Sequence, residues 1–206
     1  MNYSNSINKD LETYSSKRYV KYMICLQDKL FVQSKLNKQG INYRMTVHGA
    51  IEFLEEISYE KYHQLETELS KAGFILLDEK DSMLIDRIIN MILEVIHYSE
   101  TLPKLKFREI INNHGKLGEG SILKIFSDVK GMSVLQFIVI QKIERAKELM
   151  LYEDMPLSEI AELLNYKNQD YLIAQFKKTT GLTPSYYKRL KMERTKITEE
   201  FVNEIH

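Results

Sequence analysis

Amide, hydroxyl and ammonium side chains recur at helical spacing in two stretches of this sequence, which end before Gly131 and Gly181. Gln can form a bidentate hydrogen bond with adenine, and Lys can approach guanine or a phosphate. A basic cluster follows the second stretch, and such side chains bind phosphates without reading base sequence. We expect these groups to touch DNA if they lie on helices that can enter its grooves. The outward positions are Ser121, Lys124, Ser127 and Asp128 in the first stretch, Gln169, Asp170, Ile173, Ala174 and Lys177 in the second, and Lys178, Lys188, Arg189 and Lys191 in the cluster.

Both stretches belong to one pattern that occurs twice, without a gap, at an offset of 50 positions. An internal period of this kind usually marks a duplicated supersecondary unit. Residues of similar type also align, such as Ile122 with Leu172 and Ser133 with Thr183. The identical pairs are Glu109 with Glu159, Ile110 with Ile160, Phe126 with Phe176, and Gly131 with Gly181.

Each copy has the parts of a helix-turn-helix. Asn165 marks the turn of the second copy, because Asn tolerates the left-handed conformation that ends a helix. A second helix is predicted from about Asn168 to the residue before Gly181, where glycine commonly follows a helix end. Two short helices around such a turn can place one helix in a DNA major groove. In the second copy, the apolar positions of the first helix are Leu157, Ile160, Ala161 and Leu164, and those of the second helix are Tyr171, Leu172, Ile173 and Phe176. In the first copy, they are Phe107, Ile110 and Ile111 before the turn at Gly115, and Ile122, Ile125 and Phe126 after it.

The run 143–150 followed by 157–161, and the run 171–178 followed by 181–187, resemble the AraC/XylS family of bacterial transcription factors. The resemblance covers roughly residues 82 to 190 and implies two helix-turn-helix subdomains joined by a long helix. That helix, about 18 residues from Ser133, would be roughly 27 Å long. It could set two recognition helices about one DNA turn, roughly 34 Å, apart. Ala174 and Ile111 depart from the usual residue types of the family, and the loop 115–120 is rich in glycine, so we expect weak direct readout and more use of DNA shape.

The first 80 residues alternate between strand and helix patterns. Strands are expected at 19–24, 41–47, 51–53 and 74–77, with helices at 28–39 and from Ser58 to Gly73. This order is that of a ferredoxin-like βαββαβ domain. It also resembles heavy-metal-associated domains, whose first loop carries two cysteines. Here the first position is Cys25 and the second is Asp28, and soft ions such as Cu(I) prefer thiolate pairs, so these two residues are weak metal candidates.

The fold class is therefore α+β, with a ferredoxin-like domain followed by an all-α domain with two helix-turn-helix subdomains. A long helix capped by Asp81 or Ser82 and ending near Tyr98 would open the second domain. We expect four aromatic side chains, Phe126, Phe176, Tyr171 and Tyr187, to be core residues. The expected boundaries are a flexible N-terminus at 1–17, the ferredoxin-like domain at 18–80, the DNA-binding domain at 81–190 and a polar tail at 191–206.

Composition bounds the function without deciding it. The 206 residues are 44% hydrophobic and carry no net charge, so a packed core is expected. Residues 1–100 hold 12 basic and 15 acidic residues, and residues 101–206 hold 17 basic and 14 acidic residues. The small positive charge of the second half is a weak indication that it binds nucleic acid. One cysteine excludes an internal disulfide and favours a reducing cytoplasm. Apolar runs are too short to span a membrane, and no catalytic motif is present, so neither an enzyme nor a cofactor is expected.

The leading hypothesis is a cytoplasmic transcription regulator that binds double-stranded DNA through two recognition helices and then recruits or excludes RNA polymerase. The N-terminal domain would be a sensor, a protein-contact module or the interface of a homodimer. Two alternatives stay open. One is a metal-responsive or metal-handling protein that uses Cys25 and Asp28. The other is a protein-interaction adaptor that has lost DNA binding, because the first recognition helix is poor in basic residues.

Overall fold

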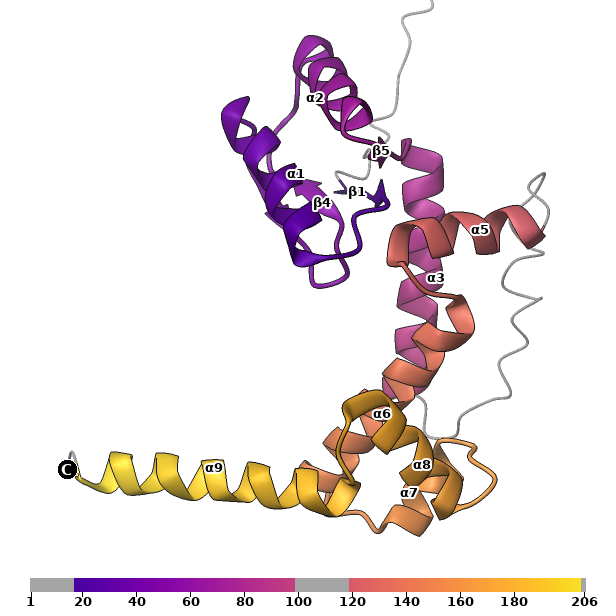
Figure 1. The fold of residues 1–206 in the computed structure, drawn as a ribbon, viewed down its shortest axis with the longest axis vertical. Helices are drawn as coiled ribbons and strands as arrows, with labels where there is room; N and C mark the ends of the chain where they lie inside the picture. The colour runs from indigo at the N-terminus through magenta and orange to yellow at the C-terminus, as the bar shows by residue number, and fades with distance from the viewer. Residues whose placement is uncertain (1–16, 99–118, 205–206) are drawn as a thin grey trace, which may run out of the picture. The chain divides into compact units, whose positions relative to one another are not determined.

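The computed structural model describes residues 17–98 and 119–204, and they pack into two compact units (Figure 1). Among the described residues, the first unit contains 17–87 together with Gly120–Met132. The second contains the described residues from Ile88 to Glu204 apart from that segment. Helix α3 (Glu79–Tyr98) passes from the first unit into the second. Each unit is described separately below.

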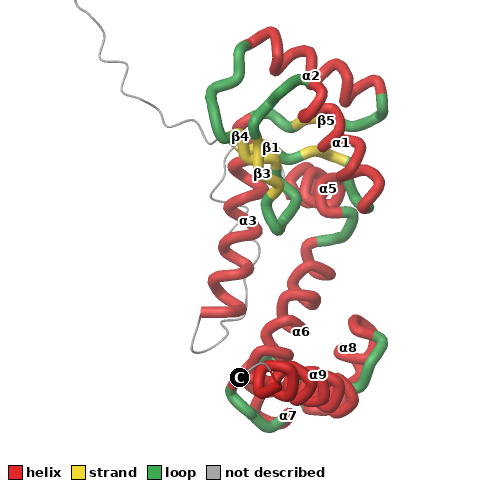
Figure 2. The backbone as a smooth tube through the Cα atoms, turned by 90° about the vertical axis from the view of Figure 1, so that its left-hand side faces the viewer, coloured by secondary structure: helices red, strands yellow, loops and turns green. Residues whose placement is uncertain are grey.

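Short antiparallel strands form the centre of the first unit, coloured yellow in Figure 2. β1 and β3 both pair with β4, and β2 pairs with β5. The first expected strand, 19–24, is confirmed only at Val20–Lys21: strand structure begins earlier, at Lys17, is divided at Tyr19 and ends before Tyr22. The elements are β1 Lys17–Arg18, β2 Val20–Lys21, α1 Leu26–Lys38, β3 Tyr43–Met45, β4 Ile51–Phe53, α2 Tyr59–Lys71 and β5 Ile75–Leu76.

The core of this unit forms where the apolar faces of α1 and α2 meet the strands. Val32 and Leu36 of α1 and Leu65 and Leu69 of α2 are 0% exposed, as is Ile51 of β4. Each helix contributes residues four positions apart, which is the spacing of one helical face. The amphipathic pattern therefore fixes which side of each helix is buried.

Short polar side chains set the beginnings of the helices. Ser58 accepts a hydrogen bond from the Lys61 N–H at the start of α2, as its position before an apolar run predicts. At the start of α3, the Asp78 carboxylate accepts the N–H of Asp81 at 2.8 Å. The expected caps of this helix, Asp81 and Ser82, are therefore wrong, and Ser82 instead lies buried with its hydroxyl accepting the Tyr19 N–H at 3.2 Å.

The second unit is helical in its described part. Ile143, Ala146 and Leu149 of α6 are buried, which makes α6 the central helix of the group. Residues 191–204, expected as part of a polar tail, continue as helix. The helices are α6 Val134–Tyr152, α7 Leu157–Leu163, α8 Gln169–Thr180 and α9 Pro184–Glu204, together with the second half of α3.

The 50-residue repeat is visible as two matched helices. α5 (Glu119–Lys130) and α8 have 12 residues each and end at Gly131 and Gly181, whose φ angles are 66° and 78°. Phe126 and Phe176 hold equivalent buried positions. The expected first helix of the first copy, with Phe107 to Gly115, and the start of its glycine-rich loop lie outside the described residues.

Candidate nucleic-acid interface

Helices α7 and α8 pack as the second expected helix-turn-helix. Ile160, Ala161 and Leu164 face Leu172 and Phe176, and each of these side chains is at most 1% exposed. Their spacing within each helix puts them on one face, so packing that face against the other helix removes the apolar surface from water. The buried face of α8 leaves its opposite side turned to solvent.

The turn between these helices is built from local backbone chemistry. Asn165 has φ 53°, the left-handed conformation that Asn tolerates. The Tyr166 N–H donates to the Ala161 carbonyl at 2.8 Å, which closes the end of α7. Asn168 then caps α8 by accepting the Tyr171 N–H at 3.0 Å. The expected turn and helix start are confirmed at both asparagines.

Most of the expected DNA-contacting positions of α8 lie on its exposed side. Gln169, Asp170, Ala174, Lys177 and Lys178 are exposed, and we call these five residues the outer face of α8. Neither lysine forms an ion pair with any described residue. A phosphate could therefore approach either ammonium group without displacing a carboxylate of the described residues.

Two aromatic or apolar positions of α8 differ from expectation. Tyr171 was expected in the core but is 57% exposed, and its ring lies under the Lys167 ammonium at 5.6 Å. Ile173, expected to face outward, is half-buried. The buried face of a helix is about 100° wide. A residue at the border of that face can be buried or exposed, so helical spacing alone does not predict its burial.

Lys142 of α6 is a structural residue of this site that the sequence patterns did not single out. Its ammonium donates to the Leu164 carbonyl at 2.7 Å and lies 5.3 Å from the centre of the Tyr166 ring. Burial lowers the pKa of Lys142 and raises the pKa of Tyr166 to about 12. The side chain thus closes the C-terminal end of α7, where carbonyl groups lack helical partners.

The basic cluster after α8 is partly neutralised by its own chain. Lys188 pairs with Asp154, which holds the pKa of that carboxyl below its usual range. Arg189 stacks on the Tyr186 ring at 4.9 Å and lies 3.9 Å from Glu193. These cations are available to a phosphate only in exchange for the contacts they already make.

The first recognition helix, α5, has a less basic surface. Ser121 and Lys124 are exposed, whereas Ser127 and Asp128 are half-buried. The Asp128 carboxylate lies 3.3 Å from the Lys124 ammonium and 3.8 Å from that of Lys21. The single lysine on the expected reading side of α5 is therefore paired with a neighbouring acid.

The C-terminal end of α5 is attached to turns that adjoin the strands of the first unit. The Tyr22 N–H donates to the Asp128 carbonyl at 2.7 Å, and the Lys130 ammonium donates to the His48 carbonyl at 2.8 Å. Burial, with a smaller effect of Lys29, lowers the pKa of Lys130 to about 8. These bonds join residues more than 80 positions apart, which no local pattern predicts.

The two weak metal candidates serve as a helix cap. The Asp28 carboxylate accepts the N–H groups of Ile24 and Cys25 at 3.0 and 2.9 Å, and hydrogen bonds to Cys25 lower its pKa. Cys25 is exposed at the N-cap of α1. Within residues 17–98 and 119–204 no three His, Cys, Asp or Glu side chains are arranged to hold a metal ion.

Comparison with known proteins gives matches over the part of the chain that contains α7 and α8. Residues 115–190 match the model of a family described as a helix-turn-helix domain. The chain is 24% identical over 119 residues to the probable transcriptional regulator LumQ of Photobacterium leiognathi. The aligned residues cover 58% of this chain and 46% of LumQ. It is 30% identical over 73 residues to the bifunctional transcriptional activator/DNA repair enzyme AdaA of Bacillus subtilis, covering 35% of each. The chain thus spans less than half the length of these relatives.

Among solved structures, the C-terminal domain of AraT, a response regulator from Geobacillus stearothermophilus, is 25% identical with a TM-score of 0.44. It covers 52% of this chain and 84% of that chain. The family match over residues 115–190 and the similarity to LumQ support a helix-turn-helix domain of the kind found in transcription regulators. None of the described helices has the length and apolar content needed to cross a membrane.

Proposed function

We propose that this protein is a sequence-specific, DNA-binding transcription regulator of the AraC type. The observation that carries the proposal is the outer face of α8, which presents Gln169 and two lysines that pair with no described acid on a helix-turn-helix. The family match over residues 115–190 and the similarity to transcription regulators support it. Insertion of α8 into a major groove would bring this face to the base edges.

Within this proposal the side chains divide by role. Gln169 and Asp170 lie in the first turn of α8, and this end of a recognition helix contacts bases in helix-turn-helix proteins. Lys177 and Lys178 lie in the last turn and would bind phosphates, which fix orientation without reading sequence. Ser121 and Lys124 would let α5 bind a neighbouring major-groove segment. The Asp128 carboxylate beside Lys124 weakens that second contact.

The remaining expectations belong to the same proposal. Residues 18–80 would form a ferredoxin-like domain, which the strand order and the antiparallel pairings favour, and residues 81–190 would form the DNA-binding domain. The N-terminal domain would sense a signal or contact a protein, including a second copy. RNA polymerase would be the partner at promoters, and the cytoplasm would be the compartment.

DNA binding can be measured by fluorescence anisotropy with duplexes from the region upstream of the gene and with shuffled duplexes of equal length. Specific binding should exceed binding to shuffled DNA by a factor of at least about 10³. Gln169→Ala should lower affinity for the specific duplex only. Equal affinity for specific and shuffled duplexes at every salt concentration would refute sequence-specific binding.

Phosphate contacts have their own test, because each one releases counterions from DNA. Replacing both Lys177 and Lys178 by Ala should reduce the slope of log K against log salt concentration by about 1.8, since each contact contributes roughly 0.9. Lys196→Ala is a matched control, because it removes an exposed lysine from another helix. An unchanged slope in the double variant would favour the adaptor hypothesis.

The adaptor hypothesis has one structural observation in its favour, which is the pairing of Lys124 with Asp128. The metal hypothesis would require Cys25 and Asp28 to exchange their capping contacts for metal ligation. Elemental analysis of anaerobically purified protein tests it, with Cys25→Ser as the comparison. No stoichiometric metal and no change in DNA binding would remove it.

A further inference from the structure

Helix α9 presents a narrow stripe of three apolar side chains, Leu190, Ile197 and Phe201, interrupted by Arg194. Positions 190, 194, 197 and 201 are separated by steps of four, three and four residues, which is the a and d spacing of a coiled coil. Leu190, Ile197 and Phe201 are 39%, 53% and 62% exposed. Figure 1 shows α9 running on beyond α6, α7 and α8, and every residue from 192 to 201 is exposed. Within the described part of the second unit, Leu190 is thus partly covered, whereas Ile197 and Phe201 stay largely exposed.

The distribution of charges along α9 is unfavourable for an isolated helix. Residues 184–196 contain five basic residues and one acidic residue, whereas residues 197–204 contain three acidic residues and no basic one. Negative charge favours the N-terminal end of a helix and positive charge the C-terminal end, so this distribution opposes the helix dipole. A neighbouring helix of the same sequence that runs the opposite way would bring its acidic end to the basic beginning of α9. The charge pattern thus favours an antiparallel copy as the neighbour.

We propose that α9 pairs antiparallel with α9 of a second copy of this chain. An a position then faces a d position, so Leu190 packs against Phe201 of the second copy. Arg194 lies opposite Ile197 of the second copy and within reach of its Glu200. A polar residue at one a position fixes register at some cost in stability, which is the role that Arg194 has here. The pairing requires no DNA and goes beyond the proposed function.

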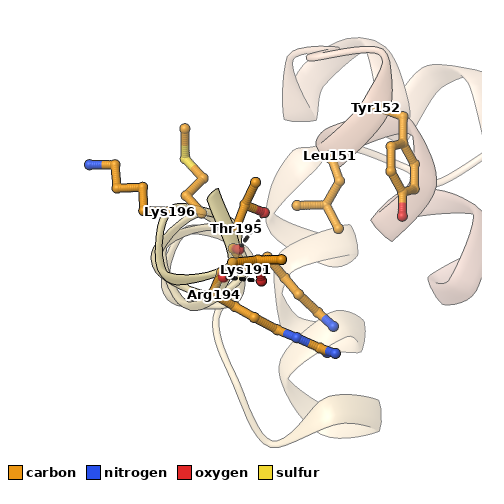
Figure 3. Close-up of a pocket in the computed structure, with 8 residues that line it drawn as sticks. Leu151, Tyr152, Lys191, Arg194, Thr195 and Lys196 are labelled. Atoms are coloured by element: carbon orange, nitrogen blue, oxygen red, sulfur yellow. Dashed lines mark hydrogen bonds between the residues drawn. The ribbon is translucent and has the colours of Figure 1, made fainter. Parts of the chain in front are cut away.

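The surroundings of Arg194 leave its charge available to such a partner. It forms no ion pair with any residue that the structure describes. Its side chain borders a cavity of about 580 Å³ between α9 and the end of α6, where Leu151 and Tyr152 form the other wall (Figure 3). Figure 3 shows Lys191 and Arg194 reaching to the same side of α9 and Lys196 to the other. The guanidinium is therefore free to meet a carboxylate from outside the chain.

Sedimentation velocity of the full-length protein without DNA, over a range of concentrations, tests the pairing. The wild type should change from monomer to dimer as concentration rises. Ile197→Asp should raise the concentration at the midpoint at least tenfold. Met192→Asp is the matched control, because Met192 is 55% exposed and lies on the opposite side of α9 from the stripe, and it should leave the midpoint unchanged. Circular dichroism checks that both variants fold.

Disulfide trapping tests the direction of the helices in a Cys25→Ser background. Leu190→Cys and Phe201→Cys are prepared separately and oxidised mildly, alone and as a mixture. An antiparallel pair gives a linked dimer only in the mixture, whereas a parallel pair gives linked dimers in each separate sample. A monomer at all concentrations, equal effects of the two Asp variants, or linkage in the separate samples would overturn the proposal. None of these results depends on whether the protein binds DNA.

Discussion

Substitution of Gly131 by Ala tests the attachment of α5 to the first unit. Gly131 has φ 66°, and an added Cβ would lie 2.7 Å from Cγ2 of Ile24. The left-handed backbone costs a non-glycine residue about 1 kcal/mol. Overpacking usually costs about 1–3 kcal/mol, and the low end applies because Ile24 is 64% exposed and can move. We expect the free energy of unfolding of this unit to fall by about 2 kcal/mol.

Gly73→Ala separates the two costs, because Gly73 also follows a helix of the first unit. Its φ is 84°, but nothing lies within 4 Å of an added Cβ. This variant should lose only the backbone contribution, about 1 kcal/mol. Ile24→Ala alone should change stability by less than about 0.5 kcal/mol, as mostly exposed positions do. When Ile24→Ala is combined with Gly131→Ala, the free energy of unfolding should recover by about 1 kcal/mol, because Ile24→Ala removes Cγ2, the atom closest to the added Cβ.

Hydrogen exchange of the α5 amides at increasing urea concentration measures these differences within the unit itself. The four proteins with and without the Gly131 and Ile24 substitutions form a double-mutant cycle, whose coupling energy reports the contact. Equal losses for the Gly131 and Gly73 variants, or a coupling energy of zero, would refute the inferred contact between α5 and Ile24.

Three further predictions concern packing, capping and pH. Phe176→Ala should lower the free energy of unfolding by about 3–5 kcal/mol because the ring is fully buried. Tyr171→Ala on the same helix should lower it by less than about 0.5 kcal/mol. Chemical denaturation of the second unit distinguishes the two variants. Asn168→Ala should lower the free energy of unfolding by about 1 kcal/mol through loss of the α8 cap, which thermal unfolding followed by circular dichroism should report as a lower midpoint temperature. Because burial lowers the pKa of Lys130 to about 8, from the ordinary lysine value of 10.5, the unfolded chain binds more protons between these two pH values. Stability relative to Lys130→Met should therefore rise with pH from about 8 to about 10.5 in urea titrations, and a flat difference would contradict this.

Local chemistry explains what the sequence predicts well. Ser58, Asn165 and Asn168 act through backbone groups within three or four residues, so their positions in the chain are enough to place a cap or a turn. Gly131 and Gly181 end their helices because the required φ is positive. The exposed residues of α8 follow from its buried face, since a helix that buries one side presents the other.

Long-range packing explains what the sequence predicts poorly. The first strand begins earlier than expected and is divided around Tyr19, whose N–H turns to Ser82 Oγ, 63 positions away. The attachment of α5 likewise depends on Tyr22 and His48, which no helical period connects with it. Tyr171 lies at the border of a helix face, where burial depends on neighbours rather than on spacing.

The contact between Asp154 and Lys188 bears on how easily this protein would leave a nucleic acid. If Lys188 binds a phosphate, as proposed, that phosphate must displace the Asp154 carboxylate, which already pairs with the lysine ammonium. Exchange of one anion for another yields little net attraction, and the displaced carboxylate then stands beside a polyanion and repels it. The residence time at such a contact would be short. Asp154→Asn should lengthen it, and the difference is measurable as a slower off-rate.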